Sequence, residues 1–581
     1  MSPSVSRVSP VAVPDTADAA WMPRRRRSGT GAPTSLACAH VVHRVSRGVG
    51  SESVPTAAPP NRTQPRDLAS ATADLNAAKR AVRRGSDDPA AGRSTGSTRL
   101  SARERVEVLL DDGSFVELDL FVRHRANGFG LDQNRPATDG VVAGWGTIDG
   151  RTVVVFAHDS RIFGGALGEM FAAKVQKVMD LAESIGCPII GLNDGGGARI
   201  QEGVDALAGF GRIFRRNVRL SGVVPQISVV LGSCAGGAVY SPALTDFVVV
   251  AADSGNMFIT GPDVVAAVTG QNVSRGELGG ASTHAERTGV ATFVAADERE
   301  CLAEVRYLLS FLPSNNSELP PRYADSDRPD RSCDRLLDLV PADTRRPYDV
   351  RGVISEIVDA GEYLEYHAGW AKNIVCALAR LNGQTVGIVG NQPQVLAGAL
   401  DIDASEKAAR FVRTCDAFNI PLITLVDVPG FLPGTDQEHN GIIRRGAKLL
   451  YAYCEATVPR IQIILRKAFG GAYIVMDSTS IGADLSFAWP TNEIAVMGAE
   501  GAANIIFRKE LAAADDPAAR REELVDEYTE RLMNSYAAAE RGLVDDVIDP
   551  RDTRRILIRS LAMLSSKRET PPTRKHGNVP L

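Results

Sequence analysis

The alternation of apolar and polar positions predicts short buried strands separated by amphipathic helices. Continuous apolar runs, typical of buried strands, occur at Thr152 to Phe156, Pro188 to Leu192, Gln226 to Leu231, Leu422 to Val426 and Ile461 to Leu465. Helical patterns occur at Asp67 to Arg84, Gly168 to Ile185, Gly203 to Leu220, Ser405 to Phe418 and Arg551 to Leu564, and the capping box Ser101-Ala-Arg-Glu104 predicts one more helix. This alternation predicts an α/β fold.

Two of the apolar runs end in the same short motif. Gln226 to Leu231 leads into Gly236-Gly237-Ala238, and Ile461 to Leu465 leads into Gly470-Gly471-Ala472. Paired glycines let a ligand approach the backbone closely and leave peptide N–H groups free to point at it. Such N–H groups at a strand-to-helix turn stabilise a developing negative oxygen. Each Gly-Gly-Ala motif is therefore a candidate oxyanion hole.

The two motifs belong to an internal duplication of domain size. Asp194 and Asp427 are 233 positions apart (427 − 194), and Gly165-Ala-Leu and Gly398-Ala-Leu have the same spacing. The Gly-Gly-Ala motifs keep this spacing within one residue. A period of this length is far beyond that of a solenoid repeat, so we expect two like domains.

Composition divides the chain into four parts. Residues 1–66 are rich in Pro, Ser and Ala and carry nine arginines against three acids, which is typical of a disordered extension. A transit peptide has a similar composition, and this alternative stays open. A proline-rich linker at 314–347 separates a domain over 67–330 from a second domain over 331–570, and a loose basic tail is expected at 571–581.

Charge and cysteine content narrow the possible classes. A net charge of −5 gives no reason to expect nucleic acid as the main partner. The eight cysteines occur singly, without a CxxC motif, so no metal site is predicted. No apolar run approaches the roughly 20 residues that span a bilayer. We expect a protein of the cytoplasm, or of the mitochondrial matrix if residues 1–66 are a transit peptide.

Side chains near the motifs suggest other chemistry. Cys234 lies in a Gly-x-Cys-x-Gly sequence of the nucleophile-elbow type, but the equivalent residue is Ala468 and no histidine partner can be assigned. We therefore favour a packing role for Cys234. Asp194 and Asp427 end buried strands and can act as general bases or cap the following turns.

A glycine run after Asp194 is a candidate substrate-binding loop. It comprises Gly196, Gly197, Ala198 and Arg199. Arg199 can meet a phosphate or form an ordinary ion pair, and the same alternatives apply to Lys467 beside the second motif.

The chain resembles the carboxyltransferase (β) subunits of biotin-dependent acyl-CoA carboxylases over residues 69–581. The resemblance rests on Thr98-Arg-Leu-Ser-Ala-Arg-Glu-Arg, Asn193-Asp-Gly-Gly-Gly-Ala-Arg-Ile-Gln-Glu-Gly, Cys234-Ala-Gly-Gly-Ala-Val-Tyr-Ser-Pro-Ala, Phe258-Ile-Thr-Gly-Pro-Asp, Asp427-Val-Pro-Gly-Phe-Leu-Pro-Gly-Thr-Asp-Gln-Glu and Arg574-Lys-His-Gly-Asn-Val-Pro-Leu. It implies two tandem crotonase-like (ClpP/crotonase) domains, in agreement with the duplication.

The resemblance also implies an assembly and a cofactor. It implies a homohexamer in which the first half of one subunit faces the second half of another. Biotin would be carried by a partner α subunit with biotin carboxylase activity, and an acyl-CoA would be the substrate. The chain has no Ala-Met-Lys-Met biotinylation motif and no glycine-rich ATP-binding loop that we can identify. The carboxyl group is therefore expected to arrive on biotin from elsewhere.

On this basis the two motifs receive separate roles. The amides of Gly470, Gly471 and Ala472 would hold the ureido oxygen of biotin as CO₂ leaves. Those of Gly236, Gly237 and Ala238 would stabilise the enolate of the acyl thioester, which attacks CO₂. Biotin would take the α proton itself, which explains why no side-chain base stands out.

Two positions depart from the pattern of the family. The family usually has Ser at the position of Gly195, so one hydroxyl is missing near the first site. At the position of Ile474, propionyl-selective members have Asp, whereas broader acetyl/propionyl members have Ile. An apolar wall tolerates different acyl chains, because a methylene is worth only about 1–3 kcal/mol of discrimination. We therefore expect a broad short-chain carboxylase that forms malonyl- or methylmalonyl-CoA.

Several alternatives stay open from the sequence alone. They are a strict propionyl-CoA carboxylase, a decarboxylase subunit that runs the same half-reaction backwards, a biotin-independent hydratase or isomerase of the crotonase class, and a non-catalytic scaffold.

Overall fold

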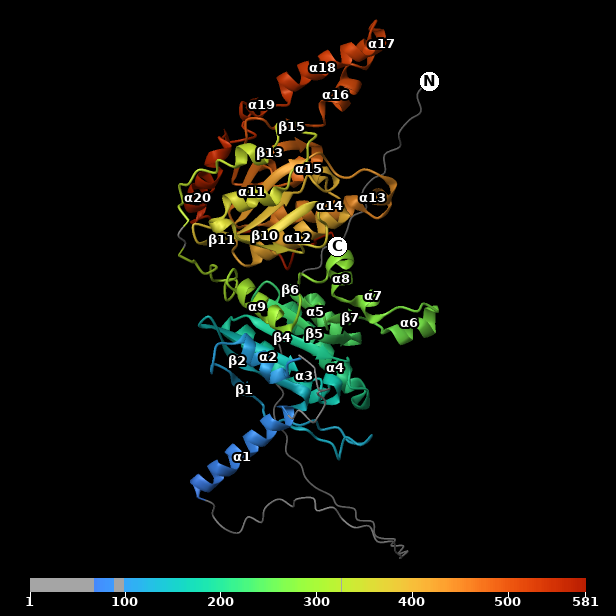
Figure 1. Ribbon diagram of the computed structural model, residues 1–581, viewed down its shortest axis with the longest axis vertical. Coiled ribbons are helices and arrows are strands. Elements are labelled where there is room, and N and C mark those ends of the chain that lie inside the picture. The colour runs from blue at the N-terminus through green and yellow to red at the C-terminus, as the bar shows by residue number, and fades with distance from the viewer. Residues whose placement is uncertain (1–66, 88–98, 325–326, 581) are drawn as a thin grey trace, which may run out of the picture. The chain divides into compact units, whose positions relative to one another are not determined.

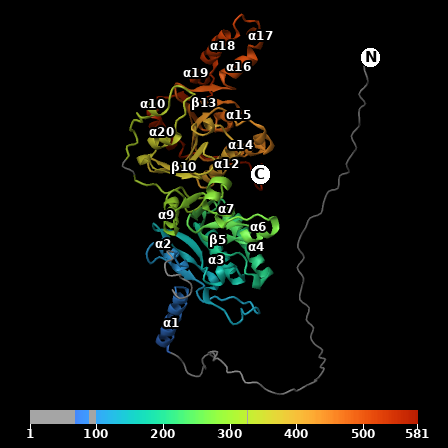
Figure 2. The same ribbon diagram turned by 45° about the vertical axis from the view of Figure 1, so that its right-hand side comes forward.

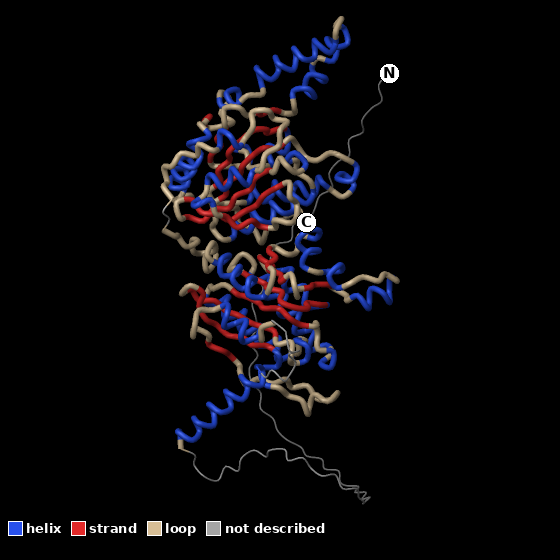
Figure 3. Tube along the Cα trace, in the orientation of Figure 1, coloured by secondary structure: helices blue, strands red, loops and turns tan. Residues whose placement is uncertain are grey.

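The fold consists of two sheets with the same topology (Figures 1 and 3). The computed structural model describes residues 67–87, 99–324 and 327–580. The expected extension at 1–66 lies outside the described residues, as do Thr98 and Leu581 of the family motifs. Residues 68–581 form one compact unit, and the division at residue 330 stays a prediction.

The first sheet has the strand order β1-β2-β3-β4-β5-β6-β8, with β7 paired to β5. The pairing is antiparallel from β1 to β3 and parallel from β3 onwards. The strands are β1 (Val116–Leu118), β2 (Val141–Ile148), β3 (Arg151–His158), β4 (Ile189–Gly195), β5 (Gln226–Ala235), β6 (Phe247–Ala251), β7 (Asn256–Phe258) and β8 (Phe293–Ala295).

In the first half, α3 packs on β2 and β3 and lies beside α4, whereas α1 extends away from the sheet (Figures 1 and 2). The predicted capping box is confirmed, because the Ser101 hydroxyl accepts a hydrogen bond from the Glu104 N–H group at the start of α2. The helices are α1 (Leu68–Asp87), α2 (Ala102–Leu109), α3 (Glu169–Ile185), α4 (Val204–Leu220), α5 (Tyr240–Leu244), α6 (Pro262–Thr269), α7 (Arg275–Gly279), α8 (Ala281–Thr283) and α9 (Glu298–Leu309).

The second sheet repeats the first strand for strand. Its order is β9-β10-β11-β12-β13-β14-β16 with β15 paired to β13, and it has the same sequence of antiparallel and parallel pairs. The duplication predicted from spacing is therefore confirmed. The strands are β9 (Tyr363–Tyr366), β10 (Ile374–Leu381), β11 (Gln384–Asn391), β12 (Leu422–Val428), β13 (Arg460–Phe469), β14 (Leu485–Ala488), β15 (Glu493–Ala495) and β16 (Asp546–Val547).

The helices of the second half include α12 and α14, which pack side by side as α3 and α4 do. The apolar run Val353 to Ile357 is helical, because its buried residues follow helical spacing within α11. The helices are α10 (Leu336–Leu339), α11 (Val350–Ile357), α12 (Ile402–Ala417), α13 (Thr435–His439), α14 (Ile442–Glu455), α15 (Gly470–Val475), α16 (Ala499–Ile506), α17 (Arg508–Ala513), α18 (Pro517–Leu532), α19 (Ser535–Ala539) and α20 (Thr553–Leu564).

Three contacts join parts of the chain that are distant in sequence. Phe247 of β6 and Tyr366 of β9 lie edge to face with ring centroids 6.4 Å apart, within a buried cluster drawn from both halves. The two halves therefore share part of their core. Beyond α20, Lys567 Nζ lies 2.9 Å from Asp484 Oδ2, and Arg574 pairs with Glu455, so the basic tail is held by ion pairs.

A buried lysine is repeated at the spacing of the duplication. Lys174 on α3 donates to the Val141 carbonyl at 2.6 Å, and Lys407 on α12 donates to the Ile374 carbonyl at 2.8 Å. Val141 and Ile374 are the first residues of β2 and β10. Each ammonium group therefore fixes the start of an antiparallel strand from inside the core.

The titration of Lys174 should appear in the pH dependence of stability. Burial lowers the pKa of Lys174 from 10.5 to about 8. Between these values the unfolded chain holds a proton that the folded chain has lost, so folding becomes more favourable as the pH rises. Relative to K174M, wild type should gain up to about 3 kcal/mol between pH 8 and 10.5. Melting temperatures of both proteins across this range measure the effect, and a constant difference would contradict it.

Candidate active site

The two Gly-Gly-Ala motifs form turns with the same backbone conformation. Gly236 and Gly470 both have φ of +60°, a value that favours glycine. The preceding residues, Ala235 and Phe469, are extended ends of β5 and β13. A short 3-10 helix over Gly236–Val239 follows in the first half, and α15 follows in the second. The predicted strand, turn and helix are thus present twice.

The glycine N–H groups of these turns are available to a ligand. The first N–H groups of a helical turn have no acceptor within it. Among the described residues, none of the backbone hydrogen bonds outside the regular elements is donated by Gly236, Gly237, Gly470 or Gly471. The space beside Gly471 is open, since a Cβ placed there would meet nothing within 4 Å.

The alanines of the two motifs are placed differently from the glycines. Ala238 and Ala472 are buried, and both belong to hydrophobic clusters beneath the turns. Near Gly237 the nearest side-chain atom is in the Phe210 ring, 3.2 Å from where a Cβ would be. The glycines therefore form the accessible part of each turn.

The loop after β4 lies against the first turn. The Gly196 N–H group donates to the Gly164 carbonyl at 3.1 Å. Gly197 has φ of +96° and approaches β5 so closely that a Cβ would lie 2.9 Å from the Ala235 carbonyl oxygen. The structure therefore brings Gly196, Gly197 and Ala198 next to the residue that precedes Gly236.

Arg199 does not have the surroundings of a phosphate-binding residue. Its side chain is 1% exposed and donates to Asp139 Oδ1 and Glu202 Oε1, both at 2.7 Å. Its guanidinium carbon also lies 4.4 Å from the centre of the Phe163 ring. Because these contacts bury the charge, the geometry favours the ordinary ion pair, one of the two alternatives, over a contact with phosphate.

Ile474 lies on α15 beside the second turn and is 42% exposed. The residue at the equivalent place after the first turn is Tyr240, which is 46% exposed and is 234 positions away (474 − 240). Tyr240 was not predicted from the sequence, although the spacing of the duplication identifies it. Each turn therefore presents one large, partly exposed side chain.

An apolar residue also borders each turn from the neighbouring short strand. Ile259 follows β7 and Val496 follows β15, and they are 61% and 78% exposed. Their carbonyl oxygens lie 3.9 and 3.0 Å from the positions of a Cβ on Gly236 and Gly470. Ile259 and Val496 were also not predicted from the sequence, because a single exposed apolar residue is common on protein surfaces and does not indicate a site.

The two aspartates at the strand ends are buried and ion-paired. Asp194 Oδ2 lies 3.0 Å from Arg105 Nη1, and Asp427 Oδ2 lies 3.0 Å from Arg466 Nε. Burial raises the pKa of the Asp427 carboxyl, and Arg466 acts against that rise. Because both carboxylates are buried in ion pairs, a structural role for Asp194 and Asp427 is favoured over a role as general bases.

Cys234 and the histidines do not form a nucleophile and base. Cys234 is buried, its thiol lies 3.3 Å from the Ala238 carbonyl oxygen, and burial raises its pKa to about 12. Burial lowers the pKa of His158 to about 3. The ring nitrogens of His284 contact Thr288 and the Met257 carbonyl. The packing role expected for Cys234 agrees with these contacts.

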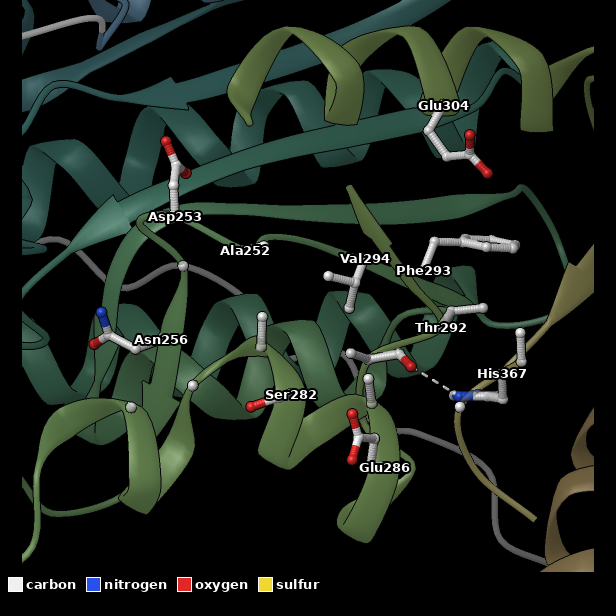
Figure 4. Close-up of a pocket in the computed structure, with 18 of the residues that line it drawn as sticks. Ala252, Asp253, Asn256, Ser282, Glu286, Thr292, Phe293, Val294, Glu304 and His367 are labelled. Carbon is white, nitrogen blue, oxygen red and sulfur yellow. Dashed lines mark hydrogen bonds between the residues drawn. The ribbon is translucent and has the colours of Figure 1, made fainter. Parts of the chain in front are cut away.

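A separate cavity of about 800 Å³ lies between β6, β8 and the chain around His367 (Figure 4). His367 Nδ1 lies 2.9 Å from the Ala291 carbonyl oxygen. The lining includes the carboxylates of Asp253, Glu286 and Glu304. Neither Gly-Gly-Ala turn contributes to it, and its acidic groups would repel an anionic substrate.

Two kinds of feature are absent from residues 67–87, 99–324 and 327–580. Within them, no helix combines the length and the apolar character needed to cross a membrane. In the same ranges, no group of three or more His, Cys, Asp or Glu residues is arranged to hold a metal ion.

The two sheets of equal topology, each ending in a Gly-Gly-Ala turn, form a tandem crotonase-like fold. Residues 94–579 match the model of the carboxyl transferase domain. The chain therefore belongs to the carboxyl transferase family, and it is the carboxyltransferase component of a biotin-dependent acyl-CoA carboxylase.

Individual relatives agree with this family. The chain is 59% identical over 483 residues to the propionyl-CoA carboxylase carboxyltransferase subunit of Haloferax mediterranei, covering 83% of this chain and 94% of the relative. It is 55% identical over 485 residues to methylmalonyl-CoA decarboxylase subunit alpha of Propionigenium modestum, covering 84% and 94%. The crystal structure of the transcarboxylase 12S hexamer with methylmalonyl-CoA bound is 50% identical, covers 90% of this chain and 100% of that one, and has a TM-score of 0.85.

Proposed function

We propose that this chain transfers a carboxyl group from biotin, carried by a partner α subunit, to the α carbon of short-chain acyl-CoA thioesters. The observation that carries this proposal is the pair of equivalent turns whose glycine N–H groups are unused. Two such turns suit a reaction in which both reactants develop negative oxygen. Acetyl- and propionyl-CoA are the proposed substrates, and malonyl- and methylmalonyl-CoA the products.

Each turn has its own reactant in this proposal. The N–H groups at Gly470 and Gly471 hold the ureido oxygen, and those at Gly236 and Gly237 hold the thioester oxygen as it gains enolate character. Biotin supplies the carboxyl group and accepts the α proton. The space beside Gly471 leaves room for the ureido group, since a Cβ placed there would meet nothing within 4 Å. Ala238 and Ala472 support the turns from below, and the loop at Gly196 to Ala198 borders the acyl site.

The active site is proposed to form between two copies of the chain. Within the described ranges, no hydrogen bond joins the first turn to the second. The apolar borders Ile259 and Val496 are exposed beside the turns, and none of the residues of apolar helix α6 is buried. Exposed apolar surface of this kind marks an interaction site. A homohexamer, in which the first half of one subunit faces the second half of another, would cover these residues.

The direct test is fixation of ¹⁴C-bicarbonate by the chain with a purified biotin carboxylase and biotin carrier subunit and ATP. Acetyl-, propionyl- and butyryl-CoA are compared as acceptors. We expect acid-stable radioactivity with acetyl- and propionyl-CoA at similar kcat/KM, and none without the partner. Fixation confined to propionyl-CoA would replace the broad specificity with a strict one, whereas activity without the partner would contradict the role of biotin.

Decarboxylation is the reverse direction of the same half-reaction, and it is kept as an alternative because the chain is also 55% identical to a methylmalonyl-CoA decarboxylase subunit. The same turns would serve the reverse half-reaction, since a catalyst lowers the barrier in both directions. The two candidates differ in the partner, because synthesis requires a biotin carboxylase. Copurification of the chain with its natural partner therefore separates them, and a biotin carboxylase would support synthesis.

Ile474 is proposed to set the preference for acyl chain length. In I474D a carboxylate would face the acyl chain, and a longer chain would lose more favourable contact with it. We expect the ratio of kcat/KM for butyryl-CoA to that for propionyl-CoA to fall by about tenfold or more. I474L, which keeps an apolar side chain of the same size, is the matched control, and its ratio should stay within about twofold. An unchanged ratio in I474D would remove this residue from the acyl site.

A further inference from the structure

The sheet has the same irregularity before each oxyanion turn. Asn193 of β4 pairs with Val230 of β5, and the next pair is Gly195 with Cys234. One residue of β4 and three residues of β5 therefore lie between these two pairs. In the second half, Val426 of β12 pairs with Ile464 of β13, and the next pair is Val428 with Ala468. Again one residue lies between the pairs on the first strand and three on the second. The extra residues form a bulge at 231–233 in β5 and at 465–467 in β13. A bulge bends its strand and re-aims the residues that follow.

Each bulge is also the place where the strand changes its neighbour. β5 pairs with β6 as far as Val230 and with β7 from Ser233 onwards. β13 pairs with β14 as far as Ile464 and with β15 from Lys467 onwards. The glycine turn begins three residues later in both halves. The direction of the turn's N–H groups therefore depends on the geometry of the bulge.

One aspartate faces each bulge. Asp427 lies between the two paired positions of β12, and its carboxylate accepts the Lys467 N–H group at 3.1 Å and Arg466 Nε at 3.0 Å. Asp194 is in the equivalent place on β4, where its Oδ1 occupies the space that a side chain at Gly232 would need. In both halves a buried carboxylate thus fills the bulge.

The guanidinium that pairs with this carboxylate comes from a different part of the chain in each half. In the second half it belongs to Arg466, within the bulge itself. The equivalent residue in the first half is Gly232, and Arg99 and Arg105 instead reach Asp194 Oδ2 at 2.7 and 3.0 Å. A Cβ on Gly232 would lie 2.5 Å from Arg99 Nη2, so glycine makes room for the incoming group. The two halves therefore share the charge arrangement and not the residues that supply it.

We propose that Asp194 and Asp427 are positioning residues that set the geometry of the two oxyanion turns through the bulges. Neither carboxylate contacts a reactant in this proposal, which rests on the role proposed above for the turns. Displacing a donor by about 1 Å is enough to cost about a hundredfold in rate. The loss should therefore fall on kcat, because the binding surface for the rest of the acyl-CoA is unchanged.

The test uses the full chain with methylmalonyl-CoA as carboxyl donor and free biotin as acceptor. In this reaction the bond between the α carbon and the carboxyl group breaks, a bond from the carboxyl carbon to a biotin nitrogen forms, and the proton of that nitrogen moves to the α carbon. D427N keeps the size of the side chain and an acceptor for the Lys467 N–H group, but loses the charge that pairs with Arg466. We expect kcat to fall about ten- to a hundredfold with KM for methylmalonyl-CoA within about twofold.

A second buried aspartate provides the matched control. Asp477 Oδ1 pairs with Nη1 of Arg460, the first residue of β13, at 2.7 Å, and both side chains are buried. D477N should lower the melting temperature as D427N does but leave kcat within about twofold of wild type. Amide hydrogen exchange provides a readout without substrate. Exchange in a peptide covering residues 466–475 should accelerate in D427N and stay unchanged in D477N.

Equal losses of kcat in the two variants, or unchanged exchange at 466–475 in D427N, would overturn the proposal. If D427N does not fold, R466K takes its place under the same criteria, since it keeps the charge and removes the Nε contact. A wild-type chain that is inactive with methylmalonyl-CoA would count against the proposed function. Hydrogen exchange would still decide the role of Asp427 in that case.

Discussion

Replacing Gly471 with proline should lower the rate of carboxyl transfer by about a hundred- to a thousandfold, equivalent to about 2.7–4 kcal/mol. The substitution removes one peptide N–H group at the place where the ureido oxygen is proposed to bind. Proline is accepted in the first turn of a helix, and Gly471 is the second residue of α15, so the fold should survive. Rates of ¹⁴C-bicarbonate fixation with the partner subunit measure the loss, and the melting temperature checks the fold.

Gly471→Ala is the control for this experiment. It keeps the N–H group, and its added methyl group would meet nothing within 4 Å. We expect its rate to lie well above that of G471P, because it keeps the donor, even though its methyl group enters the space proposed for the ureido group. A G471P enzyme with normal turnover, or a G471A enzyme as slow as G471P, would show that this N–H group has no part in the reaction.

Mixing two inactive variants should restore activity if each active site is shared between two subunits. G237P removes a donor of the first turn, and G471P removes one of the second. In a closed ring assembled at random from equal amounts, about a quarter of the sites would combine an intact first turn with an intact second turn. The mixture, unfolded and refolded together, should therefore recover up to about a quarter of the wild-type rate.

Two controls define the result of this mixing experiment. Each variant refolded alone should stay at its own low rate, and variants mixed after assembly should show no recovery while subunits do not exchange. Melting temperatures and gel filtration establish that both variants fold and assemble, which matters for G237P because the Phe210 ring is close to that position. Absence of recovery in a properly assembled mixture would place each active site within a single chain.

Local patterns in the sequence were enough to predict the turns, the duplication and five central strands, which are β3, β4, β5, β12 and β13. Apolar runs marked β5 and β13 because these strands are buried on both faces. The glycines of the two turns were identified because an oxyanion hole depends on backbone chemistry that few other residues permit. Their roles in catalysis remain proposals, which the substitutions described above can test.

The features that were missed depend on contacts between distant parts of the chain. Arg199 was considered for phosphate binding because a charged residue beside a glycine loop is normally exposed. Its burial depends on Asp139, which lies 60 positions away and gives no local signal. The bulges depend on the pairing of two strands, so neither strand reveals them alone. Tyr240 and the lysine pair could have been found by applying the duplication spacing to every residue.

The route by which Arg99 and Arg105 reach Asp194 limits how far the N-terminus can be shortened. Both arginines precede the first strand of the sheet, and Glu298 on α9 holds them in place as well. A chain that begins after residue 105 would still contain every strand and both glycine motifs. Asp194, which lies beside the bulge of the proposed acyl site, would however have lost both of its arginine partners. The smallest working unit is therefore longer at its N-terminus than the sheet and the glycine motifs would suggest.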